Sequence, residues 1–290
     1  MLPAEPAATV APLIEYLTIT QLGDGLFEAL RNQENRAGGL FGGQIFAQAL
    51  MAAGATAGAR LVHSAQASFL RPGRMEIPVT YRVEATRDGG VYSTRTVSAM
   101  QGDKLLFVLN GSFKEMEADL LGHSPATDLG WPRPEDLQPL GPSASGPRHV
   151  PYFPSLDVRP VNRDQFLLSK PGIRRIEAWF RAREATELSP LEQQAAIAFL
   201  SDFAIPFAAL SPHAGDRANT RMFTPTLNHS IWFTGRADPA AWIAHRIENR
   251  WVGDGRMLSC SEIFDRAGTP VATTMQENVL RAPSAALEGR

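Results

Sequence analysis

The sequence contains a single cysteine, Cys260, among 290 residues. One thiol excludes both an internal disulfide framework and a metal site built from several thiolates. Histidine is scarce as well, and the six histidines show no metal-ligand spacing. We therefore expect no metal, and a reducing compartment, with the cytoplasm as the simplest location.

Neither sign of charge is in surplus. The chain carries 28 Lys and Arg against 30 Asp and Glu, for a formal net charge of −2, and it has no polybasic cluster. Binding to a phosphate backbone or to an anionic lipid surface depends on a basic excess. We expect neither a nucleic acid nor a membrane among the partners.

Long apolar runs are also missing. No stretch of about 18 uninterrupted apolar residues occurs, so we expect no transmembrane helix. The first residues, MLPAEPAATVAPLIEYL, have an early glutamate and interrupting prolines but no basic region, which is not the pattern of a signal peptide. With 44% hydrophobic and 20% charged residues, the composition is that of a globular protein with a sizeable core.

Proline, glycine and serine gather in one stretch, from Ser124 to Pro160, which has no sustained periodicity. This is longer than a usual connection inside a domain and has the composition of a linker. We predict an N-terminal domain over 1–118, a linker over 119–165 and a C-terminal domain over 166–290.

The two halves resemble each other. His63-Ser64 corresponds to His229-Ser230, and the tripeptide beginning at Arg82 corresponds to the one beginning at Arg246. Turn signals follow at matching places, Asp88-Gly89 and Asp254-Gly255, then Gly102-Asp103 and Ala267-Gly268. The segments between them alternate with period two, so each half is predicted to form an antiparallel sheet of strand, strand, hairpin and strand.

A helix-like segment precedes each His-Ser pair, at 41–57 and 191–203. Both segments are apolar on nearly every side, and a helix of that kind is buried all round. The predicted fold class is α+β: a double hotdog, with two antiparallel sheets that each wrap around one long buried helix.

One carboxylate, Asp202, stands in the apolar stretch AAIAFLSDFAIPFAALSP. Its helical neighbours three and four positions away include Phe199 and Ile205, and none of these neighbours offsets a negative charge. Burying an unpaired carboxylate costs several kcal/mol or raises its pKa. Either Asp202 caps a second short helix, or it pairs with a distant group, or it acts as a base.

A second feature is Gly42-Gly43, at the start of the first predicted helix. Helix N-terminal amides stabilise developing negative charge, and glycine lets a substrate approach the backbone. These two residues are therefore candidates for binding a thioester carbonyl. Close packing of the helix against its surroundings explains them equally well.

Several motifs in order make the chain similar to the type II acyl-CoA thioesterases, over about Pro12 to Arg281. These motifs are Phe41-Gly42-Gly43-Gln44 with Gln48-Ala49-Leu50, VHSAQASFLRPG at 62–73, Ser201-Asp202, LNHSIWF at 227–233 and ATTMQENVLR at 272–281. The resemblance implies hydrolysis of a fatty acyl-CoA to free acid and CoA, in fatty acid metabolism, without metal or organic cofactor. It also implies a homo-oligomer, because hotdog sheets commonly pair between subunits.

The family's catalytic trio is an Asp, a Thr and a Gln that hold the attacking water. By motif these are Asp202, Thr226 and Gln276. Without the resemblance, Thr226 would be an ordinary strand entry and Gln276 a solvent-facing strand residue. The chain departs from the family in having Asn228 where an Asp is often found, which leaves the trio intact but bears on its local pKa or substrate preference.

Two other activities fit the same fold. Enoyl-CoA hydration would need an Asp and a His that reach one substrate, and no such local pair stands at either helix start. A non-catalytic acyl-CoA-binding protein would need no trio at all.

Overall fold

The computed structural model describes residues 11–29, 31–32, 39–118, 120–124, 126–141, 153–183, 187–215 and 222–282. The strands of the N-terminal half are β1 (Thr20–Gly23), β2 (Leu26–Ala29), β3 (Leu61–Phe69), β4 (Val79–Asp88), β5 (Tyr92–Gln101) and β6 (Lys104–Lys114). Those of the C-terminal half are β7 (Leu156–Pro160), β8 (Arg175–Ala182), β9 (Thr226–Phe233), β10 (Ile243–Gly253), β11 (Arg256–Phe264) and β12 (Pro270–Val279). The helices are α1 (Leu13–Leu17), α2 (Gly42–Ala55), α3 (Arg163–Phe166), α4 (Pro190–Ser201) and α5 (Ile205–Leu210), with short 3-10 turns η1 (Pro134–Asp136) and η2 (Ser211–His213).

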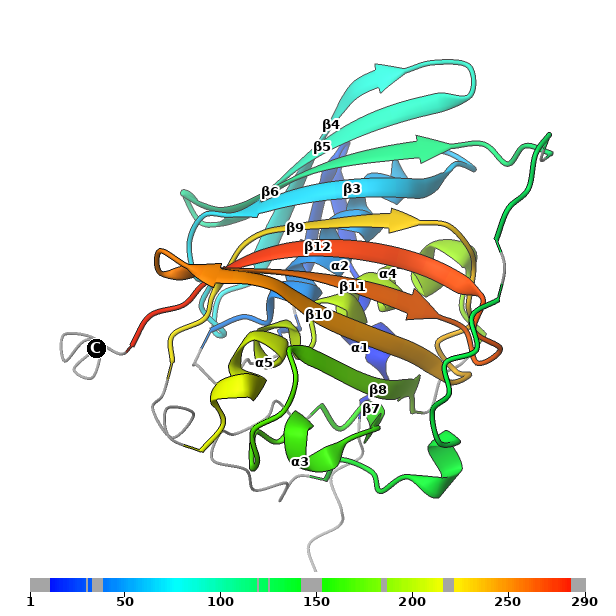
Figure 1. The fold of residues 1–290 in the computed structure, drawn as a ribbon. Coiled ribbons are helices and arrows are strands. Elements are labelled where there is room, and N and C mark those ends of the chain that lie inside the picture. Colours follow the sequence, from blue (N-terminus) through cyan, green and yellow to red (C-terminus); the bar gives the residue numbers. More distant parts are fainter. Residues whose placement is uncertain are drawn as a thin grey trace, which may run out of the picture.

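The strands form one antiparallel sheet that curves around α2 and α4 (Figure 1). Its order is β1-β2-β4-β5-β6-β3-β9-β12-β11-β10-β8-β7. The second half of this order repeats the first in reverse, so the two halves are related about the contact between β3 and β9. The sequence repeat thus corresponds to a structural repeat of one helix and its strands.

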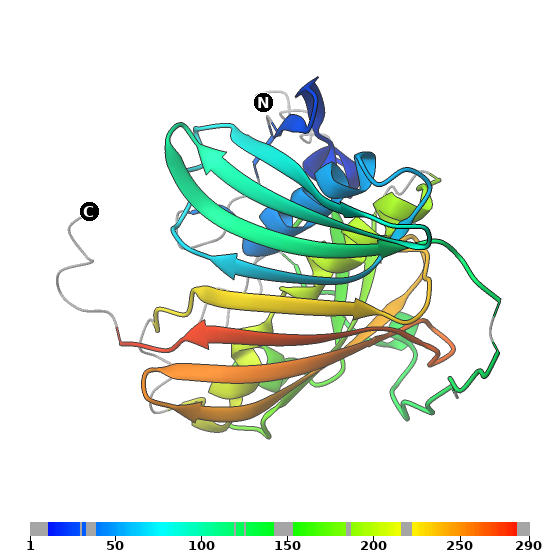
Figure 2. The ribbon, with the colours of Figure 1, turned by 90° about the horizontal axis from the view of Figure 1, so that it is seen from above.

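The prediction of two separate sheets is wrong. β3 pairs directly with β9, with Ala65 opposite Ile231 and Ser64 opposite Trp232, and Figure 2 shows these two strands side by side at the middle of the sheet. If the halves carried separate sheets, both strands would present unpaired N–H and C=O groups at an edge. Their pairing satisfies these groups and joins the halves.

Each half also contains two strands that the repeat did not reveal, β1 and β2 before α2, and β7 and β8 before α4. β7 and all but the last residue of α3 lie within residues 119–165, the range predicted as a linker. The described residues 126–141 run along the outside of the C-terminal half, where Trp131 packs edge-on against Trp179 at 5.4 Å between ring centroids.

α2 and α4 lie within two residues of the helices predicted at 41–57 and 191–203. They pack against each other and against the concave face of the sheet, where alternate strand residues are buried. Their few polar side chains have partners: Gln48 accepts from the Tyr81 hydroxyl at 2.6 Å, and Gln194 donates to the Val62 carbonyl at 2.7 Å. A capping box of Ser189 and Glu192 begins α4.

In the described part of the chain, residues 190–213 form a helical stretch long and apolar enough to cross a membrane. Of its most apolar window, 83% is buried inside the fold. Its composition is therefore accounted for by its place in the core.

Candidate active site

Asp202 lies where α4 ends and the chain turns into α5. It is the C-cap of α4, and the next helix begins after Ala204, which has a left-handed backbone with φ of 66°. Asp202 is thus not the N-cap of a second helix, which was one reading of the sequence. The sharp turn between two buried helices places its side chain beside the inner face of the sheet.

The three residues expected from the family motif lie together. Gln276 Nε2 donates to Asp202 Oδ1 at 2.9 Å and is 3.1 Å from Thr226 Oγ1. The Thr226 hydroxyl donates to the same Asp202 Oδ1 at 3.3 Å. Thr226 is the first residue of β9, and Gln276 is on the neighbouring strand β12, so three separate elements build the cluster.

The other carboxylate oxygen faces the start of α2. The Gly43 N–H donates to Asp202 Oδ2 at 2.8 Å, and a Cβ at Gly42 would lie 2.8 Å from the same oxygen. A Cβ at Gly43 would lie 2.4 Å from the Phe199 carbonyl. The packing reading of the glycine pair is confirmed at Gly43, and its amide binds the Asp202 carboxylate; binding of a thioester carbonyl by Gly42 and Gly43 stays a prediction.

Burial raises the pKa of Asp202 to about 6, and hydrogen bonds from Gln276, Gly43 and Thr226 oppose part of that rise by stabilising the charged form. A carboxylate with a pKa near neutrality is a stronger base than an ordinary aspartate and still ionises at physiological pH. The site therefore places a carboxylate suited to general-base chemistry close to a hydroxyl and an amide.

Asn278 belongs to the cluster, although sequence reasoning did not single it out. Its Nδ2 donates to Thr226 Oγ1 at 3.2 Å, and its Oδ1 is 3.4 Å from Gln276 Nε2. The signal was present, because residues two apart on a strand share a face and Asn278 follows Gln276 by two. With two N–H groups donating to its oxygen, the Thr226 hydroxyl has its proton left for Asp202.

A row of buried polar side chains crosses the C-terminal sheet through Gln276. His229 on β9 is opposite Gln276, Gln276 is opposite Ser259 on β11, and Ser259 is opposite Asn249 on β10. All four are buried. Beside this row, His229 Nε2 is 2.8 Å from the Ser201 hydroxyl, one residue before the base.

Two residues of the VHSAQASFLRPG motif, His63 and Arg71, have structural partners. His63 Nε2 bonds the Ser112 hydroxyl at 2.8 Å. Arg71 donates to the Leu105 carbonyl at 2.8 Å. Neither contacts the cluster around Asp202.

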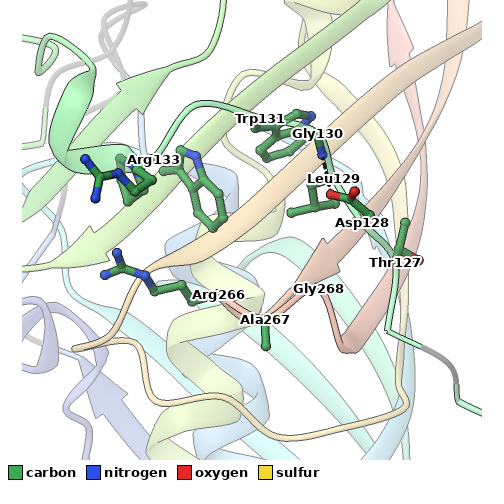
Figure 3. Close-up of a pocket in the computed structure, with 11 residues that line it drawn as sticks. Thr127, Asp128, Leu129, Gly130, Trp131, Arg133, Arg266, Ala267 and Gly268 are labelled. Atoms are coloured by element: carbon green, nitrogen blue, oxygen red, sulfur yellow. Dashed lines mark hydrogen bonds between the residues drawn. The ribbon is translucent and has the colours of Figure 1, made fainter.

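Two cavities lie outside this cluster. One, of about 190 Å³, is formed by residues 127–134, Trp179 and the β11–β12 turn (Figure 3). It is about 20 Å along β12 from Gln276, at about 3.3 Å per residue, and the guanidinium of Arg266 beside it is paired with Glu135. The other, of about 710 Å³, lies between the start of β8, the end of β10 and η2, and Asn249 of the polar row lines it.

Both halves of the chain match known protein families. Residues 31–114 match the family described as "Acyl-CoA thioesterase N-terminal domain", and residues 134–280 match "Acyl-CoA thioesterase C-terminal domain". The chain is 31% identical to Acyl-CoA thioesterase 2 of Haemophilus influenzae over 93% of this chain and 96% of that protein. It is 30% identical to human Acyl-coenzyme A thioesterase 8 over 91% of this chain and 87% of that protein.

Solved structures give the same result for the fold. Acyl-CoA thioesterase II TesB2 from Mycobacterium marinum aligns with a TM-score of 0.75 at 29% identity, over 94% of this chain and 98% of that one. A protein from Alicyclobacillus acidocaldarius described as having a hot dog fold aligns with a TM-score of 0.75 at 18% identity, over 93% and 98%. The predicted hotdog architecture and the expected family are both confirmed: the chain belongs to the type II acyl-CoA thioesterase family and is a thioester hydrolase.

Proposed function

We propose that this protein hydrolyses fatty acyl-CoA to free acid and CoA by direct attack of a water bound by Asp202, whose carboxylate Thr226 and Gln276 hold in place. The observation that supports it is the meeting of these three side chains around one carboxylate whose pKa is about 6. The substrate class follows from the names of the relatives, which are acyl-CoA thioesterases.

Asp202 is the general base in this proposal. Its Oδ1 already accepts from Gln276 and Thr226, whereas Oδ2 accepts from Gly43. The second lone pair of Oδ2 is therefore the place for the proton of the water. A Cβ at Gly42 would lie 2.8 Å from Oδ2 and 3.1 Å from Phe69 Cε1, so a larger residue at this position would crowd the oxygen.

The reaction needs no covalent intermediate. The water oxygen bonds to the thioester carbonyl carbon as Asp202 takes its proton, and the carbonyl oxygen becomes an oxyanion. The C–S bond then breaks, and the proton on Asp202 passes to the CoA thiolate. Gly42 is the first residue of α2, so its N–H has no acceptor within the helix and suits the oxyanion.

The test is thiol release from acyl-CoA by wild type and Asp202→Asn. We expect kcat to fall by about 10² to 10⁴, because the amide cannot take the proton. Asp254→Asn, on the exposed β10–β11 turn, is the matched control and is expected to keep the wild-type rate. A variant Asp202→Asn that retains more than about a tenth of the rate contradicts the assignment, as does loss of a substrate double bond without thiol release.

We further propose that the protein acts in the cytoplasm as a homo-oligomer. The outer face of the sheet supports association. Trp232 and Met275 lie on the neighbouring strands β9 and β12, and their side chains are 44% and 40% exposed. Large apolar side chains gathered on a surface are typical of protein contacts. Light scattering at working concentration tests this, and the mass of a single chain would contradict it.

A further inference from the structure

The two ends of the Gln276 side-chain amide have different surroundings. Its Nε2 donates toward Asp202 and Thr226. Its Oε1 is buried, and no described residue provides it with a hydrogen bond. Leaving a buried acceptor without a donor is unfavourable, so this oxygen is expected to have a partner.

His229 is the cross-strand neighbour of Gln276. It is directly opposite Gln276 across β9 and β12, and both side chains point inward, so their Cβ atoms are neighbours. The His229 ring is held on two sides: Nε2 is 2.8 Å from the Ser201 hydroxyl, and the Phe46 ring packs at 89° with 5.0 Å between centroids. Its Nδ1 is buried and, like Gln276 Oε1, has no hydrogen bond from the described residues.

The ring is neutral at the working pH of the base. Burial lowers the pKa of His229 to about 4, and the neighbouring Gln276 side chain opposes part of that fall. Only the Oε1 of that amide accepts a hydrogen bond, so Oε1 is the atom of Gln276 that favours a proton on the ring. His245 on β10 is also neutral, because burial lowers its pKa to about 3, so Asp202 is the charged group of this cluster.

A neutral imidazole has one proton to place. On Nε2, it would leave the Nδ1 lone pair facing the lone pairs of Oε1, with two buried acceptors unsatisfied. On Nδ1, it satisfies Oε1, and Nε2 then accepts the proton of the Ser201 hydroxyl, which turns from its other acceptor, the Ala198 carbonyl at 2.8 Å. The second arrangement leaves neither Nδ1 nor Oε1 without a partner.

We propose that His229 is a positioning residue of the hydrolase: its Nδ1–H donates to Gln276 Oε1 and keeps Gln276 Nε2 directed at Asp202. With the amide reversed, Oε1 would lie against the carboxylate and repel it. This inference rests on the proposed function, because it assigns to Asp202 the role of base. It adds a Ser201–His229–Gln276 chain of hydrogen bonds that begins one residue before that base.

Two substitutions distinguish the roles of the two ring nitrogens of His229. In His229→Asn the side-chain amide nitrogen takes the position of Nδ1, whereas in His229→Gln it takes the position of Nε2. We expect His229→Gln to lower kcat by about 10- to 100-fold with KM within about twofold, since misplacement of a catalytic group carries penalties of that size. His229→Asn is expected to restore kcat to at least about five times that of His229→Gln.

The pH profile gives a second measurement. The bond from Gln276 lowers the pKa of Asp202, so its loss in His229→Gln moves the acid limb of kcat to higher pH, and His229→Asn leaves the limb in place. His63→Gln, at the repeat-related position outside the cluster, is the control and keeps the wild-type profile. Equal kcat and equal acid limbs for the two His229 variants, with thermal unfolding showing both to be folded, overturn the proposal.

The tautomer is also measured without changing His229. In histidine-¹⁵N-labelled wild type, the signals identified through Ser201→Ala report which ring nitrogen carries the proton. A proton on Nδ1 is the expected result, and a proton on Nε2 overturns the proposal. These outcomes are independent of the Asp202→Asn assay, in which an active variant would refute the proposed function itself.

Discussion

At the scale of single residues, the ionised carboxylate of Asp202 is the group whose burial destabilises the folded protein. Asp202 stands among apolar neighbours, and burial outweighs three hydrogen bonds in setting its pKa at about 6 against an ordinary 3.8. A raised pKa means that the folded protein binds the proton more tightly than the unfolded chain does. Keeping Asp202 ionised therefore lowers the free energy of unfolding.

This predicts that Asp202→Asn is more stable than wild type at pH 7, while it is inactive. The cost of ionisation is absent below about pH 3.8, grows between 3.8 and 6, and is complete above 6. At 1.36 kcal/mol per pKa unit its upper limit is about 3 kcal/mol, less the Gly43 hydrogen bond that an amide nitrogen cannot accept. Urea unfolding at pH 7 and pH 4 measures it, and a stability difference of the same size at both pH values would contradict the prediction.

At the scale of elements, the contact between α2 and α4 positions the base. The start of α2 and the end of α4 meet at Gly43, where a Cβ would lie 2.4 Å from the Phe199 carbonyl. The other end of the same helix pair meets at Gly54, where a Cβ would lie 2.6 Å from Leu191 Cδ1. A backbone carbonyl cannot rotate away, but a leucine side chain can adopt another rotamer.

We therefore expect Gly43→Ala to be the more damaging of two matched substitutions. It forces the helices apart next to Asp202, which costs about 1–3 kcal/mol of stability and lengthens the bond from the residue-43 amide to the base. Gly54→Ala is expected to cost less stability and to keep kcat, because only Leu191 must move. Thermal unfolding and thiol release on both variants check this, and equal losses of kcat would contradict it.

At the scale of the whole molecule, one sheet makes the two halves a single folding unit. β3 and β9 are hydrogen-bonded neighbours in the middle of twelve strands. The site depends on the same union, because Gly43 from the first half binds Asp202 from the second. Separation of the halves would leave the edges of β3 and β9 unpaired and would break the bond between Gly43 and Asp202.

The tryptophans offer a test of this unity. All five lie beyond residue 130, at positions 131, 179, 232, 242 and 251. Tryptophan fluorescence therefore reports on the C-terminal half, whereas far-UV circular dichroism reports on both halves. We expect the two signals to give the same urea midpoint, as a cooperative transition requires, and two separated midpoints would show that the halves unfold independently.

The sequence alone determined some of the local elements and drew attention to one residue of the site. Apolar residues on every side predicted α2 and α4 within two residues, and period-two alternation predicted a strand, strand, hairpin and strand in each half. A lone charge in an apolar run drew attention to Asp202. Thr226 and Gln276 came from the family resemblance, since each was by itself an ordinary strand residue. Local patterns report which faces are buried, and that information is contained in a few neighbouring side chains.

Tertiary structure alone decided how these parts meet. The pairing of β3 with β9, and the roles inferred for Asn278 and His229, depend on partners far away in the chain: Gln276 lies 74 residues from Asp202, and Gly43 lies 159 residues away. Periodicity carries no information on which strand edge joins which, nor on which end of an amide faces a carboxylate. Those choices are made by the free energy of pairing buried polar groups, which exists only once the chain has folded.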